Sequence, residues 1–378
     1  MQKKALQLAS VASMIDLFNA DNIKILRSLG YSVDVATNFE EGSITSQARV
    51  DEYRNELKQQ GIRTFQIPIP RSIKKIGNIL QSYKMVKSLV EREHYQIVHC
   101  HSPIGGVICR LACRKARKTG TKVVYTAHGF HFFKGASKAA WLVYYPVEKW
   151  CSKYTDVLIT INQEDFENAR KMNARRVEYV PGIGVHTEEI ANIVIDRTSM
   201  RSSFGFDDKD FVFMSAGQIS VRKNHEVVIR ALAQIKNEKV KYLIVGFGEE
   251  QERLTKLVDE LGLKNRVIFA GYRKDVKEIL HAVDGFAFPS LQEGLPVALM
   301  EAMAVGLPVV CSRIRGNIDL IKDGEGGYLY ACYDIDGFAE GMMKIFNDHK
   351  IGLKNMETIK EFDFCKVLEK MSCIYGML

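Results

Sequence analysis

Short runs of apolar and β-branched residues alternate with amphipathic segments of about ten to fifteen residues along most of this chain. Ala20–Leu29, for example, repeats apolar residues at helical spacing and stops at Gly30, and the strand-like run Ser32–Ala36 follows it. Strands that alternate with helices form parallel βαβ units, so the pattern predicts an α/β fold. The runs interpreted as strands in the first half are Ala5–Ser10, Ser32–Ala36, Ile97–Cys100, Lys122–Thr126, Val157–Ile161 and Val177–Val180.

The alternation pauses once, and this pause predicts two domains. Pro181–Gly184 is a turn cluster, and residues 185–208 are polar and irregular. The 378 residues also exceed one ordinary domain. We predict two doubly wound Rossmann-like domains that face a central cleft, residues 1–182 and 183–358, with 359–378 as a C-terminal helix that packs back on the first. The second series of strands is Phe211–Ala216, Tyr242–Val245, Val267–Ala270, Gly285–Phe288 and Pro308–Ser312.

Composition excludes several classes of protein. Apolar residues make up 46% and charged residues 26% of the chain, which excludes a disordered chain, a collagen-like fibre and a coiled coil. No apolar run approaches the ~20 residues that span a bilayer, and the first residues lack the apolar core of a secretory leader. The eight cysteines are scattered without a CxxC pair. We therefore expect a cytoplasmic protein without disulfides.

The positive charge is concentrated in the first half of the chain. Residues 1–181 contain 28 lysines and arginines against 16 acidic residues, whereas the remainder contains 25 against 29. A basic half favours an anionic surface or an anionic substrate as its partner. The alternative is that the cations only keep the domain in solution.

Two carboxylates, Glu293 and Glu301, stand eight residues apart after a predicted strand. Pro296 favours the first turn of a helix, so Glu293 is expected in the preceding loop and Glu301 inside the helix, facing the cleft. The amides of Gly294 and Leu295 lie at the helix N-terminus, where free N–H groups and the helix dipole attract an anion. This element therefore predicts a phosphate cradle with carboxylates for sugar or ribose hydroxyls.

A cationic loop follows the predicted strand Phe211–Ala216. Gly217 permits a sharp exit from the strand, and Arg222 and Lys223 follow it. Guanidinium and ammonium groups neutralise phosphate oxygens. Because ligands of open α/β sheets bind at the carboxyl ends of the strands, we expect these cations to contact a diphosphate. The alternative is a solvated cationic turn.

Two further loops carry weaker signals. Gly246 and Gly248 follow a strand, but the third glycine of a dinucleotide fingerprint is missing, which leaves a ligand contact and a tight turn as equal alternatives. Gly271 opens the next such loop. Its backbone is expected to read a nucleobase edge, with Arg273 stacked on the base.

His128 and His131 follow the buried run Lys122–Thr126. A histidine at such a position is more often structural, but its place beside Gly129 at the sheet edge favours a role in a site.

His99 and His101 raise the question of a metal. Alternate residues of a strand face the same side, so Cys100 faces the other, and no carboxylate stands at ligand spacing. We expect no metal site there.

Taken in order, these motifs resemble the nucleotide-sugar domain of retaining GT-B glycosyltransferases of family 4. The motifs are G-(x5)-K from Gly217, V-G-x-G-x-E from Val245, F-x-G-x-x-x-D-V from Phe269 and P-S-x-x-E-G-x-P-x-x-x-x-E-A-M-A-x-G-x-P-V-V from Pro289. The first half, with H-G-F-H-F-x-K-G, Y-Y-P-V-E-K and T-I-N-x-E-D, is similar to the bacterial capsule and exopolysaccharide branch. The resemblance covers nearly the whole chain and does not specify the sugar.

The resemblance implies that the second domain binds the donor, a UDP-sugar, and the first binds the acceptor. Lys223 is expected to contact the diphosphate, Glu293 the sugar hydroxyls and Glu301 the ribose, with His128 beside the reacting bond. It implies no metal or other cofactor, because cations and helix N-termini replace the metal. The expected catalytic residues are His128, Glu293 and Lys223, and the expected donor-binding residues are Gly217, Arg222, Lys223, Gly248, Arg273, Glu293, Gly294, Leu295 and Glu301.

The chain departs from the family pattern in two places. Gln218 stands where the family has arginine directly after the glycine, and Arg222 is expected to supply that charge. The loop after the first strand, Ser10–Asp16, lacks a Gly-Gly pair. The expected acceptor-side residues are Ser13, Met14, Asp16, His131 and Lys134.

The resemblance implies a retaining, metal-independent transfer of a hexose or N-acetylhexosamine to a polyprenyl-diphosphate-linked saccharide in capsule, exopolysaccharide or other surface-glycan synthesis. A nucleotide-sugar epimerase or a phosphorylase of the same architecture is the alternative enzyme. The third alternative is a basic non-catalytic protein that binds lipid or nucleic acid through a helix over Arg110–Lys118. That helix lacks the exposed aromatics of RNA-binding proteins, so no nucleic acid partner is expected.

Cations and apolar residues interleave in the first half as in a segment that lies on a membrane. Ile73, Ile76, Ile79 and Leu80 recur at near-helical spacing between lysines. The anionic inner leaflet attracts lysine and arginine, so we expect peripheral association with the inner face of the plasma membrane. The alternative is an ordinary solvated amphipathic helix. The cations concerned are Lys74, Lys75, Lys84, Lys87, Arg114, Lys115, Arg117 and Lys118.

Overall fold

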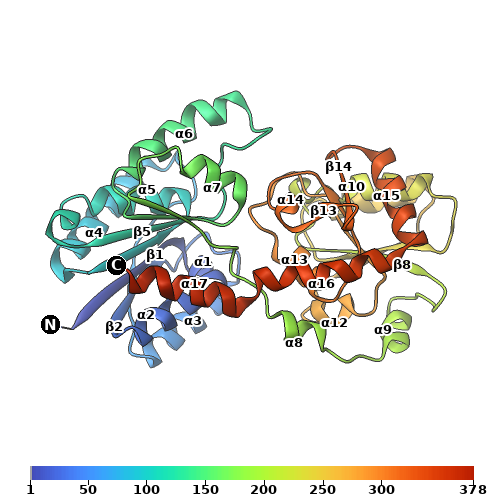
Figure 1. The fold of residues 1–378 in the computed structure, drawn as a ribbon, viewed down its shortest axis with the longest axis horizontal. Coiled ribbons are helices and arrows are strands. Elements are labelled where there is room, and N and C mark those ends of the chain that lie inside the picture. Colours follow the sequence, from blue (N-terminus) through green and yellow to red (C-terminus); the bar gives the residue numbers. More distant parts are fainter. Residues whose placement is uncertain (1) are drawn as a thin grey trace. The chain divides into compact units, whose positions relative to one another are not determined.

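The computed structural model describes residues 2–378, which form two compact units (Figure 1). Unit 1 comprises Met1–Ile183 and Cys365–Leu378, and unit 2 comprises Gly184–Phe364. Each unit is built around one parallel sheet of seven strands. The prediction of an α/β fold with two doubly wound sheets is confirmed.

The sheet of unit 1 has the strand order β3-β2-β1-β4-β5-β6-β7. The order reverses between β1 and β4, which pair from Ala5 opposite Ile97. The carboxyl ends of the strands at such a reversal are where open sheets bind ligands. The strands are β1 (Lys3–Val11), β2 (Tyr31–Asn38), β3 (Arg63–Gln66), β4 (Ile97–His101), β5 (Lys122–Ala127), β6 (Val157–Thr160) and β7 (Arg176–Tyr179).

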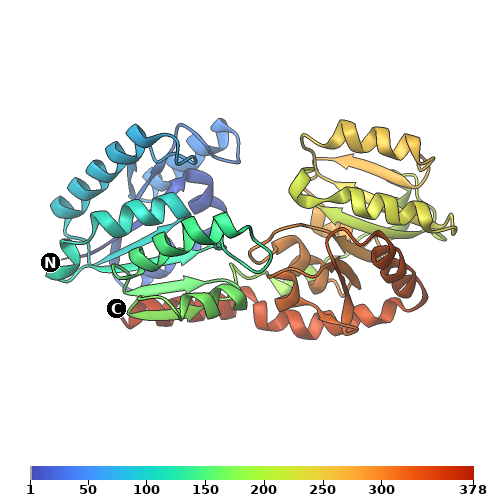
Figure 2. The ribbon, with the colours of Figure 1, turned by 90° about the horizontal axis from the view of Figure 1, so that it is seen from above.

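Helices cover both faces of this sheet, and the two faces have separate apolar cores (Figure 1). On one face the core is closed by α1 (Ala12–Phe18), α2 (Ala20–Ser28), α3 (Gln47–Gln59) and α17 (Phe364–Gly376). On the other face lie α4 (Ile76–Glu93), α5 (Pro103–Ala112), α6 (Lys138–Ser152) and α7 (Gln163–Ala169), with the short 3-10 turn η1 (Ala116–Thr119) after α5. Helices α4, α5 and α6 therefore form one layer, seen from above in Figure 2.

The sheet of unit 2 has the order β10-β9-β8-β11-β12-β14-β13, so its reversal lies between β8 and β11. Its strands are β8 (Phe211–Ala216), β9 (Val240–Val245), β10 (Val267–Gly271), β11 (Gly285–Phe288), β12 (Val309–Ser312), β13 (Lys322–Asp323) and β14 (Gly326–Tyr330). Its helices are α8 (Thr187–Ala191), α9 (Arg197–Ser203), α10 (His225–Gln234), α11 (Gln251–Glu260), α12 (Val276–Leu280), α13 (Val297–Ala304), α14 (Asn317–Leu320), α15 (Ile335–Asn347) and α16 (Leu353–Thr358). The 3-10 turns are η2 (Val221–Lys223), η3 (His349–Gly352) and η4 (Ile359–Phe362).

Two sequence expectations about elements are wrong. Residues 185–208 are not irregular throughout, because they contain α8 and α9, and the Asp196 side chain caps α9 by accepting from the Ser199 amide. The basic helix expected over Arg110–Lys118 does not exist as one helix. Helix α5 ends at Ala112, and the Arg110 guanidinium is fully buried, 2.8 Å from the Glu148 carboxylate of α6.

The eight cysteines all lie in the described part of the chain and are free thiols in the structure. No helix within residues 2–378 has both the length and the apolar character needed to cross a bilayer.

Candidate active site

Two loops meet at the strand reversal of unit 2, and three side chains converge there. Arg222 and Lys223 come from the loop after β8, and Glu293 comes from the loop after β11. The Lys223 Nζ donates to Glu293 Oε1 at 2.8 Å, and Arg222 Nη1 donates to the same oxygen at 2.7 Å. Arg222 Nη1 also donates to the carbonyl of Gln292 at 2.9 Å. The structure thus brings together three of the residues that the motifs selected separately.

The Lys223 side chain is 12% exposed in this arrangement, and its ammonium lies 4.6 Å from the centre of the Phe288 ring. Burial lowers the pKa of Lys223, and the Glu293 carboxylate acts in the opposite direction. An ammonium has three N–H donors, and Glu293 occupies one of them. The others remain available to an anion at the carboxyl ends of β8 and β11.

Glycines allow the loops of this site to approach each other. Gly246, after β9, has φ +144°, and a Cβ there would lie 1.9 Å from the carbonyl oxygen of Gly217. A Cβ on Gly248 would lie 2.2 Å from the carbonyl oxygen of Ile219. The Gly246-Phe-Gly248 turn is therefore packed against the loop that carries Lys223. Gly248 contributes by leaving room for the backbone of that loop at Ile219.

The Glu293 loop leads into α13, whose first helical hydrogen bond runs from the Met300 amide to the Pro296 carbonyl at 3.2 Å. The amides of Gly294 and Leu295 precede that bond, at the positive end of the helix dipole. The Glu293 carbonyl accepts from Arg315 Nε at 3.0 Å, and this hydrogen bond holds the backbone of the Glu293 loop in place. Arg315 was not predicted from the sequence, although a cation that follows a strand, here β12, is the same signal that indicated Lys223.

A pocket of about 640 Å³ opens beside this loop in unit 2. Glu301 of α13 lines it, together with Ala216 and Gly217 at the end of β8 and Lys274 and Lys277 near α12. Burial raises the pKa of Glu301, and Lys277 partly offsets this effect. The pocket therefore presents a carboxylate that accepts hydrogen bonds, close to the glycine exit of β8.

Arg273 lies with its guanidinium held by Asp275, with Nε to Oδ1 at 2.8 Å and Nη2 to Oδ2 at 2.5 Å. The guanidinium also lies 5.4 Å from the centre of the Phe204 ring. Two exposed aromatic rings that the sequence reasoning missed, Phe247 and Tyr272, lie at the carboxyl ends of β9 and β10 with their centroids 6.2 Å apart. These rings are better exposed for stacking on a planar ligand than the paired guanidinium.

In unit 1, His128 is half-buried at the end of β5 and is connected to a buried chain of polar side chains. His128 Nε2 lies 3.2 Å from His101 Nδ1, and His101 Nε2 lies 3.1 Å from Gln7 Oε1. Gln7 Nε2 donates to the Tyr375 hydroxyl at 3.3 Å, and that hydroxyl lies 2.6 Å from His99 Nδ1. A residue of α17 is therefore connected through strands β1 and β4 to His128.

Burial keeps these histidines neutral. It lowers the pKa of His128 to about 4 and of His99 to about 3, with His128 adding to the effect on His99. Burial also lowers the pKa of His101 well below its usual value. His99 and His101 face the same side of β4, with ring centroids 4.1 Å apart, while Cys100 belongs to the opposite core. No group of histidine, cysteine and carboxylate side chains in residues 2–378 is arranged to hold a metal.

The expected acceptor-side residues lie in different environments. Strand β1 runs directly into α1, and Ser13 is buried there with its Oγ accepting from the Ile44 amide at 3.1 Å. Asp16 is held by Arg49 of α3 through contacts of 2.6 and 3.0 Å. Met14 packs against the apolar core. His131 and Lys134 are exposed in the loop after β5, and the His131 ring lies 4.8 Å from that of Tyr144.

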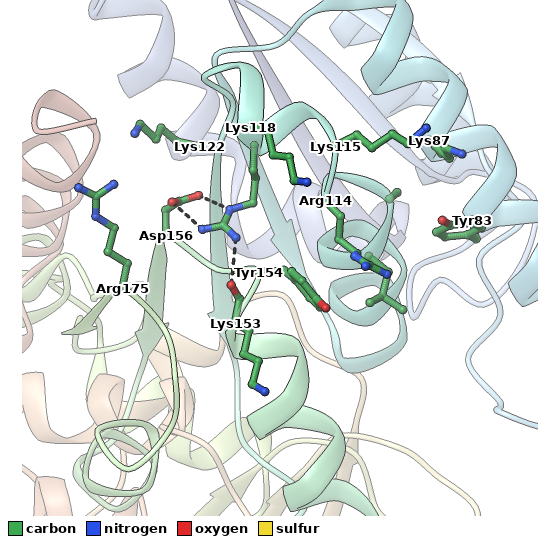
Figure 3. Close-up of a pocket in the computed structure, with 13 residues that line it drawn as sticks. Tyr83, Lys87, Arg114, Lys115, Lys118, Lys122, Lys153, Tyr154, Asp156 and Arg175 are labelled. Carbon is green, nitrogen blue, oxygen red and sulfur yellow. Dashed lines mark hydrogen bonds and ion pairs between the residues drawn. The ribbon is translucent and has the colours of Figure 1, made fainter.

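Unit 1 contains a strongly basic pocket of about 680 Å³ (Figure 3). It lies at the edge of the sheet opposite to the carboxyl ends of the strands. Lys122 begins β5, and Asp156 and Arg175 directly precede β6 and β7, which places this basic pocket at the amino ends of the strands. Asp156, its one carboxylate, is held by Arg117 through two contacts of 2.8 Å. The cations that line it are Lys87, Arg114, Lys115, Arg117, Lys118, Lys122, Lys153 and Arg175.

Both units match families of glycosyltransferases. Residues 21–189 match the family described as Glycosyltransferase Family 4, and residues 196–361 match the family described as Glycosyl transferases group 1. The chain is 35% identical to the putative glycosyltransferase EpsD of Bacillus subtilis over 100% of this chain and 97% of that protein.

A second relative is the UDP-Gal:alpha-D-GlcNAc-diphosphoundecaprenol alpha-1,3-galactosyltransferase of Escherichia coli. It is 32% identical over 80% of this chain and 80% of that protein. Among solved structures, Anabaena HepE in complex with UDP and glucose is similar with a TM-score of 0.77, at 21% identity and with 100% of both chains covered.

Proposed function

The chain belongs to the group 1, family 4 type of glycosyltransferases with the GT-B fold, and on this basis we propose that it transfers a hexose or N-acetylhexosamine from a UDP-sugar to a lipid-linked saccharide with retention of configuration. The observation that carries the proposal is the convergence of Arg222 and Lys223 on Glu293 at the strand reversal of unit 2. Two cations beside a carboxylate suit a donor whose diphosphate carries negative charge and whose sugar offers hydroxyls. That HepE was solved with UDP and glucose supports this choice of donor.

The same residues have distinct roles in the proposed reaction. Lys223 and Arg222 bind the diphosphate and stabilise the charge that grows on it as the bond to the sugar breaks. Glu293 accepts from hydroxyls of the transferred sugar and Glu301 from the ribose. The acceptor hydroxyl attacks on the side that the diphosphate leaves, and the leaving phosphate takes its proton. His128 of unit 1 is assigned a role at the reacting carbon as a neutral group, since burial lowers its pKa to about 4.

The acceptor is proposed to be a saccharide on a polyprenyl diphosphate. The Escherichia coli relative, a galactosyltransferase that acts on a diphosphoundecaprenol-linked sugar, supports this class of acceptor. We place the reaction in capsule, exopolysaccharide or other surface-glycan synthesis, because the motifs of the first half of the chain resemble that branch. The acceptor is assigned to unit 1, where Met14, His131 and Lys134 are the proposed contacts, since Ser13 is buried.

Such an acceptor keeps the enzyme at a membrane, so we propose peripheral association with the anionic inner face of the plasma membrane. Five of the eight cations selected for this role from the sequence, Lys87, Arg114, Lys115, Arg117 and Lys118, line the basic pocket (Figure 3). Lys122, Lys153 and Arg175 extend it. Each lysine or arginine near an anionic surface contributes about 1 kcal/mol of attraction, except that Arg117 is neutralised by Asp156.

The proposal is tested by incubating the purified protein with a panel of UDP-sugars and a polyprenyl-diphosphate-linked N-acetylhexosamine. We expect UDP release that requires the acceptor and continues in excess EDTA, and a product whose anomeric configuration by NMR matches that of the donor. Turnover or epimerisation of a UDP-sugar without acceptor contradicts the proposal, and so does a strict metal requirement.

A further inference from the structure

Helix α6 is apolar on the side that faces the core and on the side that faces away from it. Trp141, Tyr144 and Tyr145 pack against the core of unit 1. Leu142 and Trp150, on other sides of the helix, are 76% and 45% exposed. A helix that is apolar all round is normally covered on every side. The outward side of α6 therefore indicates an apolar ligand or partner.

A second exposed apolar segment of unit 1 comprises Ile73 and the first turns of α4. Ile76 and Leu80 are 65% and 57% exposed. Of the eleven exposed large apolar residues in the described part of unit 1, eight lie in this segment, the rest of α4, or α6. Isolated exposed apolar residues are ordinary, whereas a concentration of this kind marks a binding surface.

A cavity of about 280 Å³ lies between these two elements, and we name it the α4–α6 groove. Ile73 and Ile79 form one wall, Val143 and Val147 of α6 form the other, and Ile104 and Val107 of α5 form the floor. Its one carboxylate, Glu148, is neutralised by the buried Arg110. The volume is near the lower end of the range for ligand pockets, about 300–1,000 Å³, and suits a slender hydrocarbon chain.

The groove is continuous with the loop that follows β5. Gly129, Phe130 and His131 line it, and they directly follow His128, which the proposed function places beside the reacting bond. Cations also lie near the groove in sequence, since Lys74 and Lys75 stand between Ile73 and Ile76 and the exposed Lys138 begins α6, although Lys75 is paired with Glu41 at 3.2 Å. A molecule that joins an apolar chain to a diphosphate and a sugar matches this order of surfaces.

We propose that the α4–α6 groove binds the sugar-proximal part of the polyisoprenyl chain of the acceptor, an inference that rests on the proposed function. Burial of this part of the chain orients the diphosphate and the sugar toward the loop that begins at His128. The groove thereby selects lipid-linked acceptors over free saccharides, because the chain contributes binding free energy that a free saccharide lacks.

The test compares two acceptors that carry the same diphosphate-linked sugar, one on a polyisoprenyl chain and one on a six-carbon alkyl chain. Val107→Trp fills the floor of the groove, and Val143→Asp places a charge on its wall. We expect each variant to lower kcat/KM for the long-chain acceptor at least about tenfold and to leave that for the short-chain acceptor nearly unchanged. Val194→Asp, at an exposed valine of unit 2, is the matched control.

Equal losses for both acceptors overturn the groove proposal, and so does no loss for either. If the wild-type protein turns over neither acceptor, the proposed function fails instead. A polyisoprenyl diphosphate with a photoreactive group near its diphosphate then decides about the groove without turnover. Crosslinks confined to α6 and the Ile73–Leu80 segment, and abolished by Val107→Trp, support the proposal, whereas crosslinks elsewhere overturn it. A wild-type dimer in sedimentation equilibrium that Val143→Asp converts to a monomer identifies a second copy as the occupant and also overturns it.

Discussion

Glu293 accepts hydrogen bonds from both Arg222 and Lys223, and each cation retains N–H groups that this carboxylate does not use. The carboxylate therefore orients the two cations and competes with the phosphates for them. Its own second oxygen is available for hydroxyls of the sugar. Removing the charge of Glu293 should therefore change the binding of UDP and the rate of sugar transfer in different ways.

Glu293→Gln keeps the shape of the side chain and removes its charge. A hydrogen bond to a charged group contributes about 1.5–3 kcal/mol, so kcat/KM should fall roughly ten- to hundredfold. UDP should bind at least as tightly as before, because the cations lose a competing anion. Steady-state kinetics and calorimetric titration with UDP measure the two effects. Glu238→Gln, at an exposed carboxylate, is the control, and near-wild-type kcat/KM for Glu293→Gln rejects the assignment.

Lys223→Met retains the apolar contact with Phe288 and removes the ammonium. Loss of a buried lysine–phosphate contact of about 1.5–3 kcal/mol should raise the Kd for UDP tenfold or more. Titration calorimetry against Lys256→Met, an exposed lysine of α11, gives the comparison. An unchanged Kd, together with weaker binding by Arg222→Met, assigns the phosphate contact to Arg222.

The sequence was sufficient to select Arg222, Lys223 and Glu293, because each follows a strand that can be recognised from its own residues. It was not sufficient to select side-chain partners. Asp16 was expected to face an acceptor, but it pairs with Arg49, which is 33 residues further along the chain. The residues next to Asp16 in the sequence do not indicate that partner, because Arg49 is brought near Asp16 only by the packing of α1 against α3.

At the scale of elements, the turns that carry the site depend on contacts between their backbones. Gly246→Ala places a Cβ 1.9 Å from the Gly217 carbonyl, so the loop that carries Lys223 must shift. We expect a lower Tm, with a loss of at least about 1–3 kcal/mol of stability, and weaker UDP binding. Gly262→Ala is the matched control, since Gly262 also has a positive φ, +70°, but has open space around its Cβ position. If Gly246→Ala affects stability and UDP binding no more than the control, the contact between the turns is not important.

The histidines of β4 and β5 predict a pH dependence of stability. Their folded-state pKa values, about 3 for His99 and about 4 for His128, lie below the ordinary 6.5. The unfolded chain therefore binds more protons below about pH 6.5, and stability falls as the pH is lowered from that value toward 4. Each such histidine contributes up to about 1.4 kcal/mol per pH unit.

The Tm should accordingly decrease from pH 7 to pH 5, as measured by calorimetry. His99→Asn should make the decrease shallower, while His349→Asn, at an exposed position, should leave it unchanged. A Tm that is constant or rises on acidification contradicts the prediction. Tyr375→Phe removes the hydroxyl that joins Gln7 to His99, and it should lower the Tm at pH 7 as well.

Central strands could be located from sequence because they are buried on both sides and read as apolar runs, as Phe211–Ala216 does. Edge strand β3 was missed, since Arg63–Gln66 is partly exposed and has no such run. Helix α6 was missed for two reasons. Pro146 lies inside it, and its apolar residues surround the helix instead of forming one stripe.

At the scale of the whole molecule, the cations of unit 1 predict how the protein associates with lipid. We expect it to sediment with anionic liposomes at low salt and to be released as salt rises, because screening weakens the attraction. Neutralising Lys87, Arg114, Lys115 and Lys118 together should reduce sedimentation without changing the Kd for UDP. The control replaces the exposed Lys209, Lys236, Lys239 and Lys256 of unit 2. Equal sedimentation with neutral and anionic liposomes rejects the electrostatic attraction.

The assignment of Cys365–Leu378 to unit 1 has a consequence for biosynthesis. A ribosome that has made residues 1–183 has supplied all seven strands of the first sheet, but not the helix whose Val367, Met371 and Ile374 close one of its cores. At about 5–20 residues per second, the apolar surface reserved for α17 stays open for roughly 10–40 s while unit 2 is translated. Exposed apolar surface of this kind favours aggregation of a nascent chain, and the core that α17 closes is complete only after unit 2 has been translated.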